Sequence, residues 1–270
     1  MPRPRPSEWL ILAYFTYVAI TGSLLHAGLK PWLLWAAVAA AILLLSLRKS
    51  DFREFAPALF TLAAYREMNW FRPSVFDHHF EKIWVIWDRR LLDGWHLRAA
   101  IEFLGGAVPT YLELCYLLVY AVLFIGVGVL WGLRHRERID RFWVAYLAGT
   151  LGAYAMFPYF PSEPPRTVFA TADLPRIVTV VRAINLWLVG GYGIHSSVFP
   201  SAHVSSAFSA AWGLMATLPE RPWIGRAMAF YAACVAVATV YGRYHYAVDA
   251  VAGVAVSFFA VIALWLYRKP

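Results

Sequence analysis

Long apolar blocks constrain this chain more than any other feature of its sequence. A helix needs about 20 apolar residues to cross a bilayer, at a rise of about 1.5 Å per residue. Several blocks meet or approach that length, and they cover roughly residues 9–29, 31–47, 109–131, 141–158, 201–218 and 246–267. Two further blocks are a shorter one at 224–241 and a marginal one at 54–70. The pattern predicts an all-α fold, a polytopic bundle of transmembrane helices.

Composition agrees with a membrane protein and excludes several other classes. The chain has 270 residues, of which 61% are hydrophobic and 15% charged, whereas a soluble domain has about 25% charged residues. Its mean hydropathy is +0.56. These values exclude a disordered, a collagen-like and a disulfide-rich secreted chain. Cys115 and Cys234 lie inside apolar blocks, so they indicate neither a disulfide framework nor a metal site.

The basic residues predict how the chain is oriented. The net charge is +8, and Lys and Arg gather at block ends, which is the positive-inside pattern and not the basic stripe of a nucleic-acid-binding protein. The clusters before residue 9 and after residues 47, 131, 218 and 267 are assigned to the cytoplasmic side. Both termini then lie inside, so the number of crossings is even. Counting 54–70 gives about eight crossings, within a range of six to eight.

The same assignment predicts the location and the organisation of the chain. The first apolar run is too long for a signal peptide and lacks a convincing cleavage site, so it is interpreted as a retained anchor. We expect a protein of the bacterial inner membrane whose active site faces the extracytoplasmic side. Residues 71–108 should form an interfacial amphipathic helix rich in Trp, and a short surface helix is expected near 174–189. With no linker visible, 1–108 (N-terminal spans and interfacial segment) and 109–270 (catalytic helical bundle) form one membrane domain.

The stretch from Tyr241 to Asp249 carries the first candidate for chemistry. His245 and Asp249 are four residues apart, so on a helix they share one face. A carboxylate beside an imidazole fixes its tautomer and raises the basicity of the free nitrogen. A carboxylate one turn into a membrane helix is costly to keep. The alternative is a polar pair that only satisfies itself at a helix end.

A second stretch, Ser201-Ala202-His203, opens the block at 201–218. A preceding Pro and a Ser suit a helix start, and the free N–H groups and positive dipole end of a helix bind anions. Taken alone, this stretch is more often a plain capping segment. The topology puts it on the same membrane face as His245.

A third stretch, Pro164-Pro165-Arg166, follows the block at 141–158 and lies on that face too. A guanidinium there can clamp phosphate oxygens bidentately, although a single arginine at a membrane surface more often reaches for lipid headgroups. The three stretches together supply what phosphoryl transfer through a phosphohistidine needs. One imidazole attacks, a carboxylate orients it, a second imidazole protonates the leaving oxygen, and cations hold the phosphate. Arg243 is a further candidate cation.

The order of these motifs resembles the type-2 phosphatidic acid phosphatase superfamily, over roughly 109–267. The Pro-Pro-Arg and His-Tyr-x-x-Asp forms are more similar to its inositol phosphorylceramide synthase-like branch. The resemblance implies that His245 is the nucleophile, Asp249 its partner and His203 the general acid. It also implies that Arg166, Ser201 and the amides around Ala202 contact the phosphate. No metal or other cofactor is implied.

The chain departs from the superfamily pattern at several motif positions. The glycine of the second motif is Ala202, and the positions of the first-motif Lys and the third-motif Arg fall on Tyr159 and Thr239. Arg243 lies two residues before His245 and is the candidate substitute. Arg72-Pro73 also spells the Arg-Pro of the first motif, but it lies far from His203 in sequence, so Arg166 is preferred.

The predicted function is an integral-membrane lipid phosphatase or phosphotransferase. It would act on a lipid phosphate and pass the phosphoryl or phospho-headgroup to water or, as a phosphotransferase, to a lipid alcohol such as a sphingolipid. A phosphoinositol transferase that makes an inositol phospho(sphingo)lipid is the alternative within this class. A lipid transporter or flippase, in which polar residues would mark a path at the midplane, and a non-catalytic scaffold are the alternatives of other classes. The sequence leaves the lipid, the acceptor and the oligomeric state open.

Overall fold

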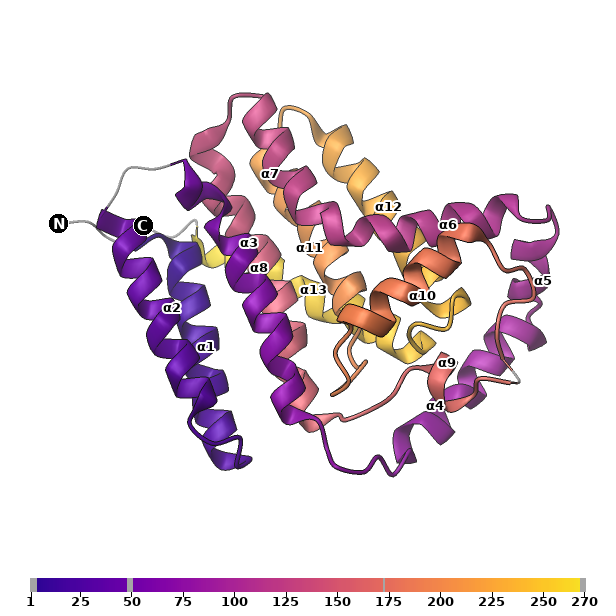
Figure 1. The fold of residues 1–270 in the computed structure, drawn as a ribbon. Coiled ribbons are helices and arrows are strands. Elements are labelled where there is room, and N and C mark those ends of the chain that lie inside the picture. Colours follow the sequence, from indigo (N-terminus) through magenta and orange to yellow (C-terminus); the bar gives the residue numbers. More distant parts are fainter. Residues whose placement is uncertain (1–3, 48–50, 172, 268–270) are drawn as a thin grey trace.

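The computed structural model describes residues 4–47, 51–171 and 173–267, and within them it is all-helical with no strand (Figure 1). Each predicted apolar block falls on a long helix, as the apolar pattern requires. In chain order the helices of these blocks are α1 (Pro6–Leu24), α2 (Lys30–Leu47), α3 (Phe52–Glu67), α6 (Ala107–Leu118), α7 (Val122–Gly132), α8 (Ile139–Met156), α11 (Ala202–Thr217), α12 (Pro222–Tyr241) and α13 (Ala247–Tyr267). The block at 109–131 is broken by the 3₁₀ turn η3 (Val119–Ala121), which joins α6 to α7.

Four helical segments of the described chain are long and apolar enough to cross a membrane, and they mark it as an integral membrane protein. They are α2, the continuous segment 107–132, α12 and α13. The other long helices are shorter or less apolar: α3 carries Glu54, Arg66 and Glu67, and α11 has only 16 residues. The count of about eight crossings remains a prediction.

Two helices, α8 and α11, form the centre of the bundle. α11 packs against α8, α12 and α13, and α8 also contacts α1, α3 and α13. Small residues bring the two central helices together: the Ser205 hydroxyl donates to the Gly149 carbonyl at 2.9 Å. Because neighbouring helices cover α8 and α11 on most sides, their sequences need no continuous lipid-facing stripe.

The basic loops gather at the end of the bundle opposite the three motifs. Arg53 pairs with Glu8 at 2.7 Å, and Arg138 pairs with Glu220 at 2.6 Å. Asp140 at the start of α8 accepts from Ser7 of α1 and interacts with Tyr267 of α13. The start of α1 and the end of α13 therefore lie at one end of the bundle (Figure 1), which an even number of crossings requires.

The two long segments predicted for the outer face contain the short helices. In 71–108 the single amphipathic helix of the prediction is instead two, α4 (His79–Arg89), continued by the π turn η2 (Arg90–Gly94), and α5 (Leu97–Glu102). The helix breaks because Gly94 and a left-handed His96, at φ 56°, end the regular hydrogen-bonding. In 159–199 lie α9 (Pro165–Val168) and α10 (Val180–Tyr192), which starts later than predicted, at a Thr179 cap. The remaining 3₁₀ turns are η1 (Met68–Phe71), η4 (Arg136–Arg138) and η5 (Phe157–Tyr159).

Candidate active site

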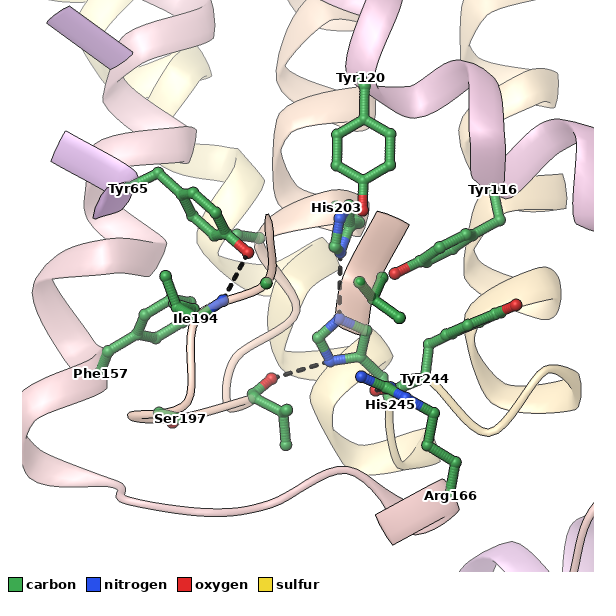
Figure 2. A pocket seen from close by; sticks show the side chains of 14 residues that line it. Tyr65, Tyr116, Tyr120, Phe157, Arg166, Ile194, Ser197, His203, Tyr244 and His245 are labelled. Atoms are coloured by element: carbon green, nitrogen blue, oxygen red, sulfur yellow. Dashed lines mark hydrogen bonds between the residues drawn. The ribbon is translucent and has the colours of Figure 1, made fainter. Parts of the chain in front are cut away.

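Two histidines from different motifs meet at one end of the bundle. His203 lies in the first turn of α11, and His245 lies in the loop between α12 and α13. His203 Nδ1 is 3.2 Å from His245 Nε2, and the two rings meet edge to face at the wall of a pocket (Figure 2). Residues 42 positions apart in sequence are thus in direct contact.

The other ring nitrogen of His245 is held by oxygen atoms. Nδ1 lies 2.9 Å from the Val198 carbonyl and 3.4 Å from Asp249 Oδ2. Both oxygens accept, so we assign the proton of the neutral ring to Nδ1, which leaves the lone pair of Nε2 facing His203 and the pocket. Burial lowers the pKa of His245 well below its usual value, and the nearby His203 and Arg166 lower it further. The ring is therefore held neutral in the state that can attack.

Asp249 is held in place by the loop that carries His245. Its side chain is fully buried, and Oδ2 accepts from the Tyr246 backbone N–H at 2.8 Å. The Asp249 carbonyl in turn accepts from the Ser201 N–H at 2.9 Å, which connects the start of α13 to the start of α11. The two helix starts that carry the motifs are thereby fixed to each other.

The start of α11 has the predicted capping geometry. The Ser201 hydroxyl accepts from the Val204 N–H at 3.4 Å, and Ser201 is completely buried. Ala202 and His203 line the pocket, whereas Ser201 lies behind them. Gly253 of α13 permits this approach, because a Cβ there would lie 2.6 Å from the Ser201 carbonyl oxygen.

Arg166 reaches the pocket from α9, beyond the two prolines. Its backbone N–H donates to the Arg243 carbonyl at 3.1 Å, and its Nη1 donates to the Tyr244 carbonyl at 3.4 Å. Its guanidinium carbon lies 5.4 Å from the centre of the Tyr244 ring, near His245 (Figure 2). The contacts to the third motif fix the arginine beside the histidine that it was predicted to assist.

Arg243 is not brought to the pocket. Its side chain is fully buried and pairs with Asp88 of α4, and its Nη2 lies 3.8 Å from Asp173 Oδ2. Asp88 also accepts from the Ala247 N–H at 2.8 Å. In this structure Arg243 fixes the loop of His245 to the interfacial helix, whereas the sequence predicted a phosphate contact. Its partner Asp88 lies 155 residues earlier in the sequence, so the residues around Arg243 give no signal of this pairing.

The pocket itself is an open recess of about 450 Å³, a volume that includes the solvent at its mouth. Arg166, Ala202, His203 and His245 are the predicted site residues among its walls. The remaining walls, which the sequence analysis missed, are Tyr65, Tyr116, Tyr120, Phe157, Val189, Gly193, Ile194, Ser197, Val198 and Tyr244. The tyrosines of 109–131 gave no usable signal, since an aromatic residue in an apolar block is most simply explained as core or lipid-facing.

A sequence model of the PAP2 superfamily matches residues 85–264, two thirds of the chain. The chain belongs to the PAP2 superfamily. The matched region runs from α4 to α13 and contains every site residue described above except the wall residue Tyr65. It supports a phosphatase-type activity and does not extend to the inositol phosphorylceramide synthase-like branch. No curated protein and no solved structure matches the chain.

One buried polar network stands behind the pocket of this PAP2 protein. The Tyr244 hydroxyl donates to Glu113 of α6 at 2.7 Å, and Glu113 also accepts from Arg182 and Asn185 of α10, each at 2.8 Å. Arg182 further donates to the Gly242 carbonyl at 3.0 Å. Charges inside a membrane bundle are retained where they are paired, and here the paired groups hold the loop 242–246 from behind.

Proposed function

We propose that the chain is an integral-membrane lipid phosphatase or phosphotransferase that works through a phosphohistidine on His245. The observation that carries the proposal is the pair formed by His203 and His245, at 3.2 Å, with the far nitrogen of His245 held by Val198 and Asp249. The lone pair of one nitrogen, Nε2, thereby faces His203 and the pocket, and the other nitrogen is fixed. This is the arrangement of an activated nucleophile with an orienting partner.

The geometry supports a two-step reaction. In the first step His245 Nε2 attacks phosphorus, the bond from phosphorus to the lipid oxygen breaks, and His203 donates a proton to that oxygen. A phosphate anion beside His203 favours the protonated ring that this step needs. In the second step water or a hydroxyl gives a proton to His203 as its oxygen attacks phosphorus, and the P–N bond breaks. Nε2 then regains its electron pair.

The remaining site residues act on charge and orientation. Arg166 lies beside His245 and would hold the phosphate oxygens, since a guanidinium matches them bidentately. The N-terminus of α11 around Ala202 offers free N–H groups to the same oxygens. Asp249 keeps Nδ1 protonated and stabilises positive charge that develops on the ring during attack.

We also propose an orientation for the enzyme in its membrane. The basic loops lie at one end of the bundle and the pocket at the other, and by the positive-inside rule this supports a pocket on the extracytoplasmic side of a bacterial inner membrane. Residues 1–108 then supply the N-terminal spans and the interfacial segment, and 109–270 the catalytic bundle. The lipid that donates phosphate reaches the pocket from that outer leaflet.

Release of the lipid alcohol by purified protein in detergent tests the proposal. His245→Ala should lower turnover by about 10³-fold or more, as loss of a nucleophile does, while His26→Ala, in an exposed turn, serves as the matched control. Labelled phosphate should be trapped on wild-type protein as an acid-labile, base-stable adduct and not on His245→Ala. Addition of a lipid alcohol separates transfer from hydrolysis. Undiminished turnover in His245→Ala would contradict the phosphohistidine mechanism.

A further inference from the structure

Two buried serines, Ser162 and Ser197, meet beside the loop that leads into α11. Ser162 lies between η5 and α9, and Ser197 lies between α10 and α11. Their hydroxyl oxygens are 3.3 Å apart, and both residues are almost completely buried. The Ser197 hydroxyl donates to the Phe160 carbonyl at 2.5 Å. The segment that follows α8 is thereby joined to the segment that precedes the second motif.

The two serines hold the peptide units on either side of Val198. The Val198 N–H donates to Ser162 Oγ at 3.2 Å, and the Phe199 N–H donates to Ser197 Oγ at 3.1 Å. The second of these peptide units carries the Val198 carbonyl, which lies 2.9 Å from His245 Nδ1 (dashed in Figure 2). A peptide whose N–H is hydrogen-bonded has a more polarised carbonyl and is a better acceptor. Two hydroxyl oxygens therefore fix both the place and the strength of this backbone acceptor.

The Val198 carbonyl is a different kind of partner for His245 from Asp249. Asp249 Oδ2 lies farther from Nδ1, at 3.4 Å, and already accepts from the Tyr246 N–H. A carboxylate can take up a proton, whereas a backbone carbonyl only accepts hydrogen bonds. The carbonyl therefore requires a hydrogen on Nδ1 whatever the charge of Asp249, and Nε2 keeps its lone pair.

We infer that Ser162 and Ser197 are positioning residues for His245, which act by holding the Val198 carbonyl against Nδ1. When that carbonyl is displaced, the neutral ring can adopt the other tautomer, in which Nε2 carries the hydrogen and has no lone pair for phosphorus. Ser162 lies outside the pocket walls, so its effect does not come from contact with a ligand. The inference rests on the proposed function and adds the residues that prepare its nucleophile.

Nitrogen NMR of the histidine-labelled full chain in detergent tests the tautomer without any substrate. The signals of His245 are identified by their loss in His245→Ala. At pH 8, where the ring is neutral, we expect the hydrogen on Nδ1 in the wild type. Ser162→Ala and Ser197→Ala should each show at least a severalfold gain of the form protonated on Nε2. A wild-type tautomer in both serine variants would overturn the inference.

Kinetics with phosphatidic acid give a readout that a merely structural serine would not move. In Ser162→Ala we expect kcat to fall by about tenfold, the value of one buried hydrogen bond, while KM changes by less than about twofold. The hydrogen bond to the Val198 carbonyl raises the pKa of His245, so its loss should move the acid limb of kcat/KM to lower pH. The other groups that face His245, namely His203, Arg166 and Asp249, are unchanged in this variant.

Two further variants separate positioning from folding. Ser257→Ala is the matched control, because Ser257 is fully buried in α13, outside the pocket walls, and accepts from Trp212 at 3.1 Å. It should lower the melting temperature without moving the tautomer or the acid limb. Ser162→Thr keeps the hydroxyl and should keep both at their wild-type values. A lower kcat in Ser162→Ala with an unmoved acid limb would overturn the inference, whereas turnover that survives in His245→Ala would overturn the proposed function itself.

Discussion

The two ring nitrogens of His245 lie in different surroundings, and this difference decides what the residue can do. Nδ1 lies against the Val198 carbonyl and Asp249, while Nε2 faces His203. The spacing of His245 and Asp249 in sequence predicts only their shared face. The carbonyl of Val198 comes from a segment 47 residues earlier, and only the fold brings it there.

The pH dependence of the reaction follows from the pKa of His245. Burial lowers this pKa below 6.5, and the charge of Arg166 contributes, so the neutral, attacking form persists as the pH falls. We expect the acid limb of kcat/KM to lie below pH 6.5, on the acid side of a bell-shaped profile. In Arg166→Gln the acid limb of the profile should shift to higher pH, toward pH 6.5, although the absolute rate falls. Profiles measured from pH 4.5 to 9 check this; an acid limb above 6.5 in the wild type would contradict a neutral, buried nucleophile.

Arg243 gives a second prediction at this scale, because it is buried against Asp88. Asp88→Leu leaves the buried arginine with only the longer contact to Asp173, 3.8 Å from its Nη2, and should destabilise the protein by about 3–5 kcal/mol. The double variant Asp88→Leu with Arg243→Met should recover most of that loss, measured as thermal unfolding in detergent. If Arg243 instead contacts phosphate, Arg243→Met alone should raise KM without loss of stability. That result would favour the prediction from sequence over the geometry.

These residues show how far sequence reasoning reaches within the site. His203, His245 and Asp249 were singled out as candidates because helix starts and the four-residue spacing are local signals. The partner of Arg243 was not found, since Asp88 belongs to a different element. Tyr116 and Tyr120 were missed because apolar blocks in a membrane protein contain tyrosines for several reasons, and only their contact with His203 distinguishes them.

At the scale of elements, the contact between α8 and α11 positions the site, since α11 carries His203. Gly149 lies at that contact, and a Cβ there would overlap the Ser209 hydroxyl. Gly149→Ala should therefore destabilise the bundle by about 1–3 kcal/mol, the usual cost of overpacking. Gly128→Ala in α7 is the matched control, because a Cβ there meets nothing within 4 Å. The control should keep or slightly raise the melting temperature, and an equal effect of both variants would argue against a tight contact at Gly149.

The predicted elements differ from the observed ones where local breaks matter. Apolar length predicted each long helix, because a continuous run of about 20 apolar residues is a strong signal for a spanning helix. It did not predict η3 within 107–132 or the break between α4 and α5, which depend on a few backbone angles. Helix ends are set by caps such as Thr179, and these shift boundaries by several residues without changing which segments are helical.

For the whole molecule, the basic loops and the pocket lie at opposite ends of the bundle, and this arrangement predicts how the chain is oriented in the membrane. Arg138 and Glu220 lie at one end and the pocket at the other, and the positive-inside rule assigns the basic end to the cytoplasm. In a background without Cys115 and Cys234, we expect Ser74→Cys to react with an impermeant maleimide in intact cells. Arg221→Cys should react only after permeabilisation; both positions are exposed. Labelling of both from one side would contradict a bundle that crosses the membrane between them, and a reversed pattern would place the pocket in the cytoplasm, where it would meet the lipids of the inner leaflet instead.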